Sequence, residues 1–227
     1  MIELSKRLQM VASLVPASET VADVGTDHGY LAVWLLQNGR AQRVQATDIH
    51  EGPLMRCRQS ALEHGLQDKI ETHLCDGLQF VGAEQAQTIV IAGMGGETMI
   101  SILAAAPWTK HGRTLVLQPQ SKRPELEHWL NAHGYGLQTA VLCRDAGKLY
   151  LAMTAVGGKP GCGLCAEALL LRSRDPLLPD LLAAEAQKLT HALRGMEQAA
   201  RELKELRTET MQRLEQIQAY QKEVAAW

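Results

Sequence analysis

A glycine-rich turn at residues 23–30, DVGTDHGY, is the first segment whose residue types suggest chemistry, because it joins a predicted strand to a predicted helix. Glycines at such a turn let the backbone approach a ligand closely. The segment has the pattern G-x-x-x-G, and Asp27 occupies the second glycine position of the dinucleotide-binding pattern G-x-G-x-x-G. A carboxylate there would face the pyrophosphate of a dinucleotide. The turn therefore favours a cationic ligand over a diphosphate, although a tight turn without a ligand remains an alternative.

Acidic residues also end the next two predicted strands. Asp48, followed by Ile49, lies about twenty residues after the turn, where a carboxylate can accept hydrogen bonds from ribose hydroxyls. Asp76-Gly77 follows the third strand, and the Asp76 carboxylate could accept a hydrogen bond from an adenine amino group. Each acid taken singly could be a solvated loop residue or a helix cap. Together, at the carboxyl edge of one sheet, they predict S-adenosylmethionine, whose sulfonium is cationic.

The fourth predicted strand ends in the small residues AGMGG, 92–96, which would let the chain pass close to cofactor and substrate. A flexible turn that caps a helix is the alternative. Methyltransferases that act on exocyclic amines commonly have Asp or Asn, two prolines and an aromatic residue here, whereas a ring nitrogen with an in-plane lone pair needs no such group. The predicted cofactor contacts are Asp23, Gly25, Thr26, Gly29, Asp48, Ile49, Asp76, Gly77, Ala92, Gly93 and Met94.

Strands and helices alternate along the segment that must position these residues. Short β-branched runs predict strands at 20–25, 43–49, 69–74, 88–93, 113–119, 137–143 and 149–156. Amphipathic patterns predict helices at 30–37, 52–64, 97–106 and 123–132, with another before the first strand. The last two strands are too close for a crossover helix and should form an antiparallel hairpin. The pattern predicts an α/β fold with a mostly parallel seven-stranded sheet and an antiparallel edge hairpin.

The composition changes after Gly157. GGKPGCGLC is typical of a loop, and the chain from about Asp180 onward is rich in Ala, Leu, Glu, Lys, Arg and Gln, which favour helix. Apolar residues at steps of three and four predict an antiparallel helical hairpin or coiled coil. We therefore expect a cofactor-binding domain at 1–160 and a helical hairpin at 161–227. The hairpin could pack on its own domain, form a dimer or contact RNA.

Composition excludes several classes of protein. The 227 residues carry a net charge of −2, which excludes a polycation that coats nucleic acid. They contain no apolar run long enough to cross a membrane and no signal peptide, so we expect a cytoplasmic protein without a membrane partner. Cys162 and Cys165 form one C-x-x-C pair without further zinc ligands nearby, so no metal is expected. A monomer is favoured.

The segments DVGTDHGYL, TDIHEGPL, DKIETHLCDGL, IAGMGGETM and LQPQ resemble the bacterial tRNA (adenine-N1)-methyltransferases of the TrmK family. The resemblance implies a class I Rossmann-like methyltransferase fold, a C-terminal coiled coil, and methylation of N1 of adenine 22 in tRNA with S-adenosyl-L-methionine. Ala32 replaces the family's usual proline and Gln120 its usual asparagine, and RDAGKLYL replaces a more acidic pattern. The last two departures bear on substrate choice more than on methyl transfer.

On this hypothesis three residues act at the reacting atoms. Positive charge moves to adenine as N1 attacks, and Asp27 would stabilise that charge. Tyr30 would stack on the extruded base and His28 would orient cofactor or substrate, although a turn histidine more often bonds to backbone. We expect Lys6, Arg7, Gln118 and Arg123 to contact tRNA; solvated surface charge is the alternative for the three cations.

Two rival functions remain open at this stage. One is a non-catalytic module that binds S-adenosylmethionine or a nucleotide and recruits a protein partner through the helical hairpin. The other is a Rossmann-type oxidoreductase, which Asp27 disfavours because it would repel the cofactor's pyrophosphate.

Overall fold

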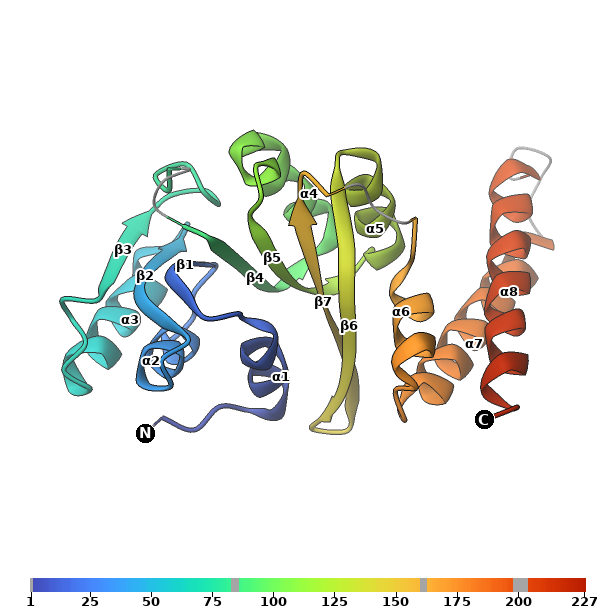
Figure 1. Ribbon diagram of the computed structural model, residues 1–227. Coiled ribbons are helices and arrows are strands. Elements are labelled where there is room, and N and C mark those ends of the chain that lie inside the picture. Colours follow the sequence, from blue (N-terminus) through green and yellow to red (C-terminus); the bar gives the residue numbers. More distant parts are fainter. Residues whose placement is uncertain (1, 83–85, 160–162, 198–203) are drawn as a thin grey trace. The chain divides into compact units, whose positions relative to one another are not determined.

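The computed structural model describes residues 2–82, 86–159, 163–197 and 204–227 (Figure 1). The chain divides into two compact units, Met1–Ala166 and Glu167–Trp227. The boundary that the sequence predicted, between residues 160 and 161, falls on residues outside the described ranges, as does Cys162.

The first unit is built on one seven-stranded sheet with strand order β3-β2-β1-β4-β5-β7-β6. Strands β1 to β5 are parallel, and β7 is antiparallel to both of its neighbours, β5 and β6. This confirms the predicted mostly parallel sheet with its antiparallel edge hairpin. The strands are β1 (Ser18–Val24), β2 (Ala41–Asp48), β3 (Ile70–Leu74), β4 (Thr88–Gly95), β5 (Thr114–Ser121), β6 (Tyr135–Asp145) and β7 (Lys148–Gly157).

Helices cover both faces of this sheet (Figure 1). On one face α1 packs on α2 and α2 on α3, while α4 packs on α5 on the other. The predicted helices 30–37 and 123–132 have the expected bounds, and the other two differ by one residue at each end. The helices are α1 (Lys6–Leu14), α2 (Tyr30–Gln37), α3 (Glu51–Glu63), α4 (Gly96–Ala105), the short 3₁₀ helix η1 (Pro107–Lys110) and α5 (Arg123–Ala132).

The core lies between the sheet and these helices because the central strands bury side chains on both faces. The last four residues of β1 and the first four of β4 are all buried. Such strands read as continuous apolar runs in the sequence, as expected for parallel strands covered on both sides. The rigid sheet fixes the carboxyl ends of β1, β2 and β4 relative to one another.

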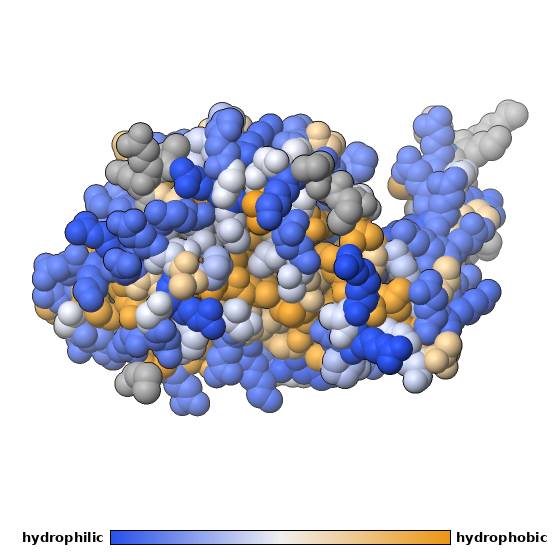
Figure 2. Space-filling model, viewed as in Figure 1, coloured by the Kyte–Doolittle hydropathy of each residue, from blue (hydrophilic) through white to orange (hydrophobic). Residues whose placement is uncertain are grey.

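The second unit contains α7 (Leu178–Glu197) and α8 (Lys204–Val224), which pack on each other and run in opposite directions (Figure 1). Arg213 of α8 forms ion pairs with Glu167 at 2.5 Å and with Glu185 at 3.5 Å. Hydrophilic residues cover most of α8 in the space-filling view (Figure 2). A supercoil of these helices stays a prediction. The helix α6 (Ala166–Ser173) was not predicted from the sequence.

Candidate active site

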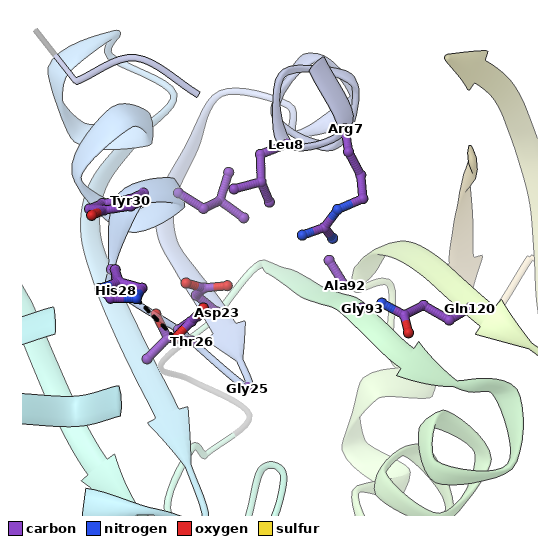
Figure 3. Close-up of a pocket in the computed structure, with 13 residues that line it drawn as sticks. Arg7, Leu8, Asp23, Gly25, Thr26, His28, Tyr30, Ala92, Gly93 and Gln120 are labelled. Atoms are coloured by element: carbon purple, nitrogen blue, oxygen red, sulfur yellow. Dashed lines mark ion pairs between the residues drawn. The ribbon is translucent and has the colours of Figure 1, made fainter. Parts of the chain in front are cut away.

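A cavity of about 300 Å³ opens at the carboxyl edge of the sheet, where β1 and β4 end (Figure 3). Most of its lining comes from the segment after β1, and α1, β4 and β5 supply the rest. The lining residues are Arg7, Leu8, Asp23, Gly25, Thr26, Asp27, His28, Gly29, Tyr30, Leu31, Ala92, Gly93 and Gln120. The structure thus brings together ten of the residues that the sequence singled out as site residues.

The turn after β1 owes its shape to two glycines in the left-handed region. Gly25 has φ +73° and Gly29, the N-cap of α2, has φ +70°. A Cβ on Gly29 would lie 2.9 Å from the Cα of Cys57 in α3, and one on Gly25 would lie 2.1 Å from the Cε of Met94. Both positions therefore exclude side chains, and the turn can lie against α3 and the end of β4.

Asp23 is a buried acid at the edge of the cavity. It is 6% exposed, and burial raises the pKa of its carboxyl from the usual 3.8 to about 6; the nearby Asp48 carboxylate adds to the rise and the Thr26 side chain opposes it. Within the described part of the chain, no cation forms an ion pair with Asp23. A buried carboxylate of this kind is stabilised by a positively charged ligand.

Asp27 lies at the outer rim of the same cavity, with 76% of its side chain exposed. Its Oδ1 is 3.1 Å from Nη2 of Arg56 on α3 and 3.6 Å from Nε2 of His28. The His28 ring stacks on Tyr30, with centroids 5.1 Å apart and planes at 19°. Arg56 therefore joins the three predicted catalytic residues in one exposed cluster.

The other two predicted acids lie at neighbouring strand ends, beside the cavity lining. Asp48 accepts a hydrogen bond from the backbone N–H of His50 at 2.8 Å, and Ile49 is largely exposed. Asp76 is exposed, while Gly77 is buried and its carbonyl accepts a hydrogen bond from the Thr47 hydroxyl. The β2 and β3 ends thus form a continuous edge with the β1 turn.

At the end of β4, Ala92 and Gly93 line the cavity. The pairing of β4 with β5 is irregular here, with register shifts between Ala92 and Met94 and between Met94 and Gly95. The Met94 side chain lies against Gly25 and does not line the cavity. Met94 thus packs between the end of β4 and the β1 turn, and its predicted contact with the cofactor stays a prediction.

Arg7 enters the cavity from α1 and is held by three contacts. Its Nη1 donates to Oε1 of buried Gln118 at 2.9 Å, its guanidinium lies 5.9 Å from the Tyr150 ring centroid, and its backbone N–H donates to Asp145. Gln118 is 1% exposed and holds Arg7 in place, and its predicted contact with tRNA stays a prediction. Figure 3 shows the Arg7 guanidinium and the Gln120 amide on the same side of the cavity.

Comparison with known proteins shows which family this chain belongs to. Residues 4–153 match the family described as "Methyltransferase domain". The chain is 34% identical over 158 residues to the tRNA (adenine(22)-N(1))-methyltransferase of Bacillus subtilis, a match that spans 69% of this chain and 66% of that protein, just under two thirds of its length. The crystal structure of the B. subtilis m1A22 tRNA methyltransferase TrmK has a TM-score of 0.87 and 29% identity, covering 97% of this chain and 100% of that one.

The chain belongs to the TrmK methyltransferase family. A Streptococcus pneumoniae structure in complex with S-adenosyl-L-methionine has a TM-score of 0.81 and 29% identity to this TrmK-family chain, covering 96% of it and 100% of the other. The resemblance inferred from the sequence motifs is confirmed.

The predicted tRNA-contacting cations of this TrmK-family protein have different surroundings. Lys6 is exposed on α1, whereas Arg123 is 8% exposed and forms an ion pair with Glu127 at 2.6 Å. Glu127 also accepts a hydrogen bond from the backbone N–H of Ala166. A phosphate contact by Arg123 would have to break this buried pair, and the contact of Arg123 with tRNA stays a prediction.

Sequence reasoning missed Leu8, Leu31 and Arg56 as parts of this region. Leu8 and Leu31 follow the apolar spacing of their helices, so nothing distinguishes them from core residues. Arg56 lies on the exposed side of α3 and pairs with Asp27 from 29 residues away. Only the tertiary packing of α3 on the β1 turn reveals it.

Among residues 2–82, 86–159, 163–197 and 204–227, no three His, Cys, Asp or Glu side chains lie together in a way that could hold a metal ion. None of the helices in these ranges has the length and apolarity needed to span a bilayer.

Proposed function

We propose that this protein transfers a methyl group from S-adenosyl-L-methionine to N1 of adenine 22 in tRNA. The observation that carries the proposal is the buried Asp23 carboxylate, which has no cationic partner in the described residues and lines a cavity in a TrmK-family chain. The relatives named as adenine-22 methyltransferases supply the substrate assignment.

The β1–β2–β3 side of the edge suits the cofactor. Asp23 would bind one of its cationic groups, and Gly25 and Gly29 leave room for the backbone to approach it. Asp48 and Asp76, at the next strand ends, would accept hydrogen bonds from ribose hydroxyls and the adenine amino group. When bound, S-adenosyl-L-methionine supplies a methyl group on a positively charged sulfur.

The β4–β5 side suits the substrate base. In folded tRNA the N1 edge of an adenine is paired or stacked, so the base must leave its stack at a cost of a few kcal/mol. Ala92 and Gly93 present little bulk where the ring must pass, while Tyr30 lies exposed across the cavity, on the side of the β1 turn (Figure 3). The N1 lone pair carries no proton, so the residues need only orient the ring and exclude water.

Asp27 would stabilise the positive charge that develops on adenine. Because Asp27 also forms an ion pair with Arg56, part of its negative charge is compensated, and its electrostatic effect on the base is smaller. Lys6 and Arg7 of α1 would bind phosphates near the extruded nucleotide, since both stand on the helix that borders the substrate side.

The decisive experiment measures methyl transfer from labelled S-adenosyl-L-methionine to two unmodified tRNA transcripts that differ only in adenine or guanine at position 22. Labelling of the adenine transcript alone is expected. Equal labelling of both would exclude position 22 as the target. Cofactor binding without transfer to either transcript would contradict the proposed activity and favour a binding module.

A further inference from the structure

The side chain of Gln120 at the end of β5 has no assigned role in the proposed reaction. It is exposed and lines the cavity, and its amide has no hydrogen-bond partner in the described residues. Figure 3 shows it directed toward the space beside Gly93. The neighbouring polar group, Arg7, already donates to Gln118. Gln120 is thus the cavity's free carboxamide on the substrate side.

The strand order separates this carboxamide from the cofactor contacts. The acids proposed for the cofactor end β1, β2 and β3, which form one half of the parallel sheet. β4 lies next to β1 on the other side, and β5 with Gln120 lies beyond β4. A ligand group next to Gln120 is therefore separated from the cofactor half by the end of β4.

Gly93 keeps the space in front of Gln120 open. A Cβ on Gly93 would stand 3.6 Å from both Nε2 of Gln120 and Nη1 of Arg7, so Gly93 borders both of these side chains. Because Gly93 has no side chain of its own, it leaves the Gln120 carboxamide and the Arg7 guanidinium facing the cavity.

The chemistry of N1 methylation restricts which edge of adenine such a group can bind. N1 must face the methyl donor, so a contact at N1 itself would block the reaction. N6–H and N7 stay accessible on the adjacent Hoogsteen edge of the base, and a glutamine can bind both at once: its oxygen accepts from N6–H and its N–H donates to N7. Guanine has two acceptors, O6 and N7, on this edge, so a glutamine, which presents one acceptor and one donor side by side, pairs well with only one of them.

We infer that Gln120 is a specificity-determining residue that binds the N6–H and N7 edge of the target adenine. The inference rests on the proposed function. The same contact would also favour the reaction, because N6–H becomes a stronger donor as positive charge moves onto the ring. Gln120 thus selects adenine over guanine and holds N1 toward the cofactor side.

The test combines an enzyme substitution with an atomic substitution in the RNA. A tRNA with adenine 22 and one with 7-deazaadenine at the same position, which lacks the N7 acceptor, are methylated by wild-type, Gln120→Ala and Gln120→Asn enzymes. Gln42→Ala is the matched control, since Gln42 is an exposed glutamine at the start of β2, at the amino edge of the sheet and away from the cavity at the carboxyl edge.

We expect Gln120→Ala to lower kcat/KM on the adenine tRNA by about 10-fold to 100-fold, as for loss of a bidentate base contact. The Kd for S-adenosyl-L-methionine should not change. Gln120→Asn, which keeps the carboxamide, should retain more activity than Gln120→Ala, and Gln42→Ala should match wild type. The deaza substitution should lower kcat/KM for the wild-type enzyme but change it less than about twofold for Gln120→Ala.

Equal deaza effects in wild type and Gln120→Ala would overturn the inference, because the two losses would then be independent. Full activity of Gln120→Ala would do the same. If wild type methylates the adenine tRNA while Gln120 proves unimportant, the proposed function stands without this inference. Lack of transfer by wild type overturns both.

Discussion

Asp23 has opposite effects on the free protein and on the complex it is proposed to form. Its carboxyl has a pKa of about 6 in the folded protein and 3.8 as the usual value, so folding favours the protonated form. The stabilising contribution of this proton is complete below pH 4 and is lost as the pH rises through 6. At neutral pH the buried charge therefore destabilises the ligand-free protein.

We predict that Asp23→Asn raises the free energy of unfolding at pH 8 by up to about 3 kcal/mol, the value that corresponds to the difference between the two pKa values. Urea unfolding of the ligand-free protein measures it. At pH 4 the variant and wild type should have nearly equal stability. A gain of equal size at both pH values would show that charge is not the cause.

The same residue predicts how cofactor affinity depends on pH. Because the carboxylate form is the one that binds a cation, the Kd for S-adenosyl-L-methionine should rise as the pH falls below about 6, approaching 10-fold per pH unit. Calorimetric titration between pH 8 and pH 5 measures the change. The Asp23→Asn variant should bind S-adenosyl-L-methionine weakly, with a Kd that does not depend on pH. If its Kd still changed with pH as in wild type, another group would be responsible for the titration.

Residue identity could be predicted from the sequence better than residue environment. Strand-end placement was enough to single out Asp23 and the glycines around it. The burial of Arg123 and its ion pair with Glu127 could not be predicted, because they depend on packing that the sequence pattern does not contain. The contact between Arg7 and Gln118 joins residues 111 positions apart, so no local signal indicates it.

At the scale of elements, the β1 turn packs closely against α3 at Gly29. Gly29 faces the backbone of Cys57, whereas Gly39, after α2, has a similar φ of +65° and no atom within 4 Å of the position that a Cβ would occupy. Alanine substitutions at these two positions therefore distinguish the cost of backbone strain from the cost of steric overlap.

Gly39→Ala should cost only the strain of a left-handed alanine, about 1–2 kcal/mol in unfolding free energy. Gly29→Ala adds the overlap with Cys57, which should increase the loss by a further 1–3 kcal/mol and displace α2 from α3. Thermal or urea unfolding of both variants gives the comparison. Similar losses in the two variants would mean that α3 moves freely away from the turn.

The periodic patterns predicted the strands and most helices because those elements bury long apolar stretches. α6 escaped prediction because it directly follows a segment rich in Gly, Pro and Cys that is typical of a loop. Its buried side chains, Ala166, Leu169 and Leu170, need surrounding structure to make the helix favourable.

At the scale of the whole molecule, a net charge of −2 means that tRNA must meet local groups of cations. Lys6 is exposed on the helix that carries Arg7, while Lys69 is exposed just before β3, at the opposite edge of the sheet. The two lysines offer a matched pair, because each loses one positive charge on substitution by alanine.

We predict that Lys6→Ala weakens tRNA binding and reduces the slope of log affinity against log salt concentration by about one unit. Lys69→Ala should leave both quantities close to wild type. Filter binding of one tRNA over a series of salt concentrations measures the slopes. Equal changes in the two variants would indicate a diffuse electrostatic attraction without a contact at Lys6.

The strand order also determines when the site can first exist during synthesis. β7 lies between β5 and β6, and α1 packs on all three of these strands. The backbone of Arg7 reaches Asp145, 138 residues later, and its guanidinium lies over Tyr150. A growing chain thus carries α1 through most of translation without β6 and β7, and the contacts of Arg7 with Asp145 and Tyr150 form only after β7 has left the ribosome. Nascent chains that stop before β7 therefore lack two of the three contacts that hold Arg7 in the cavity.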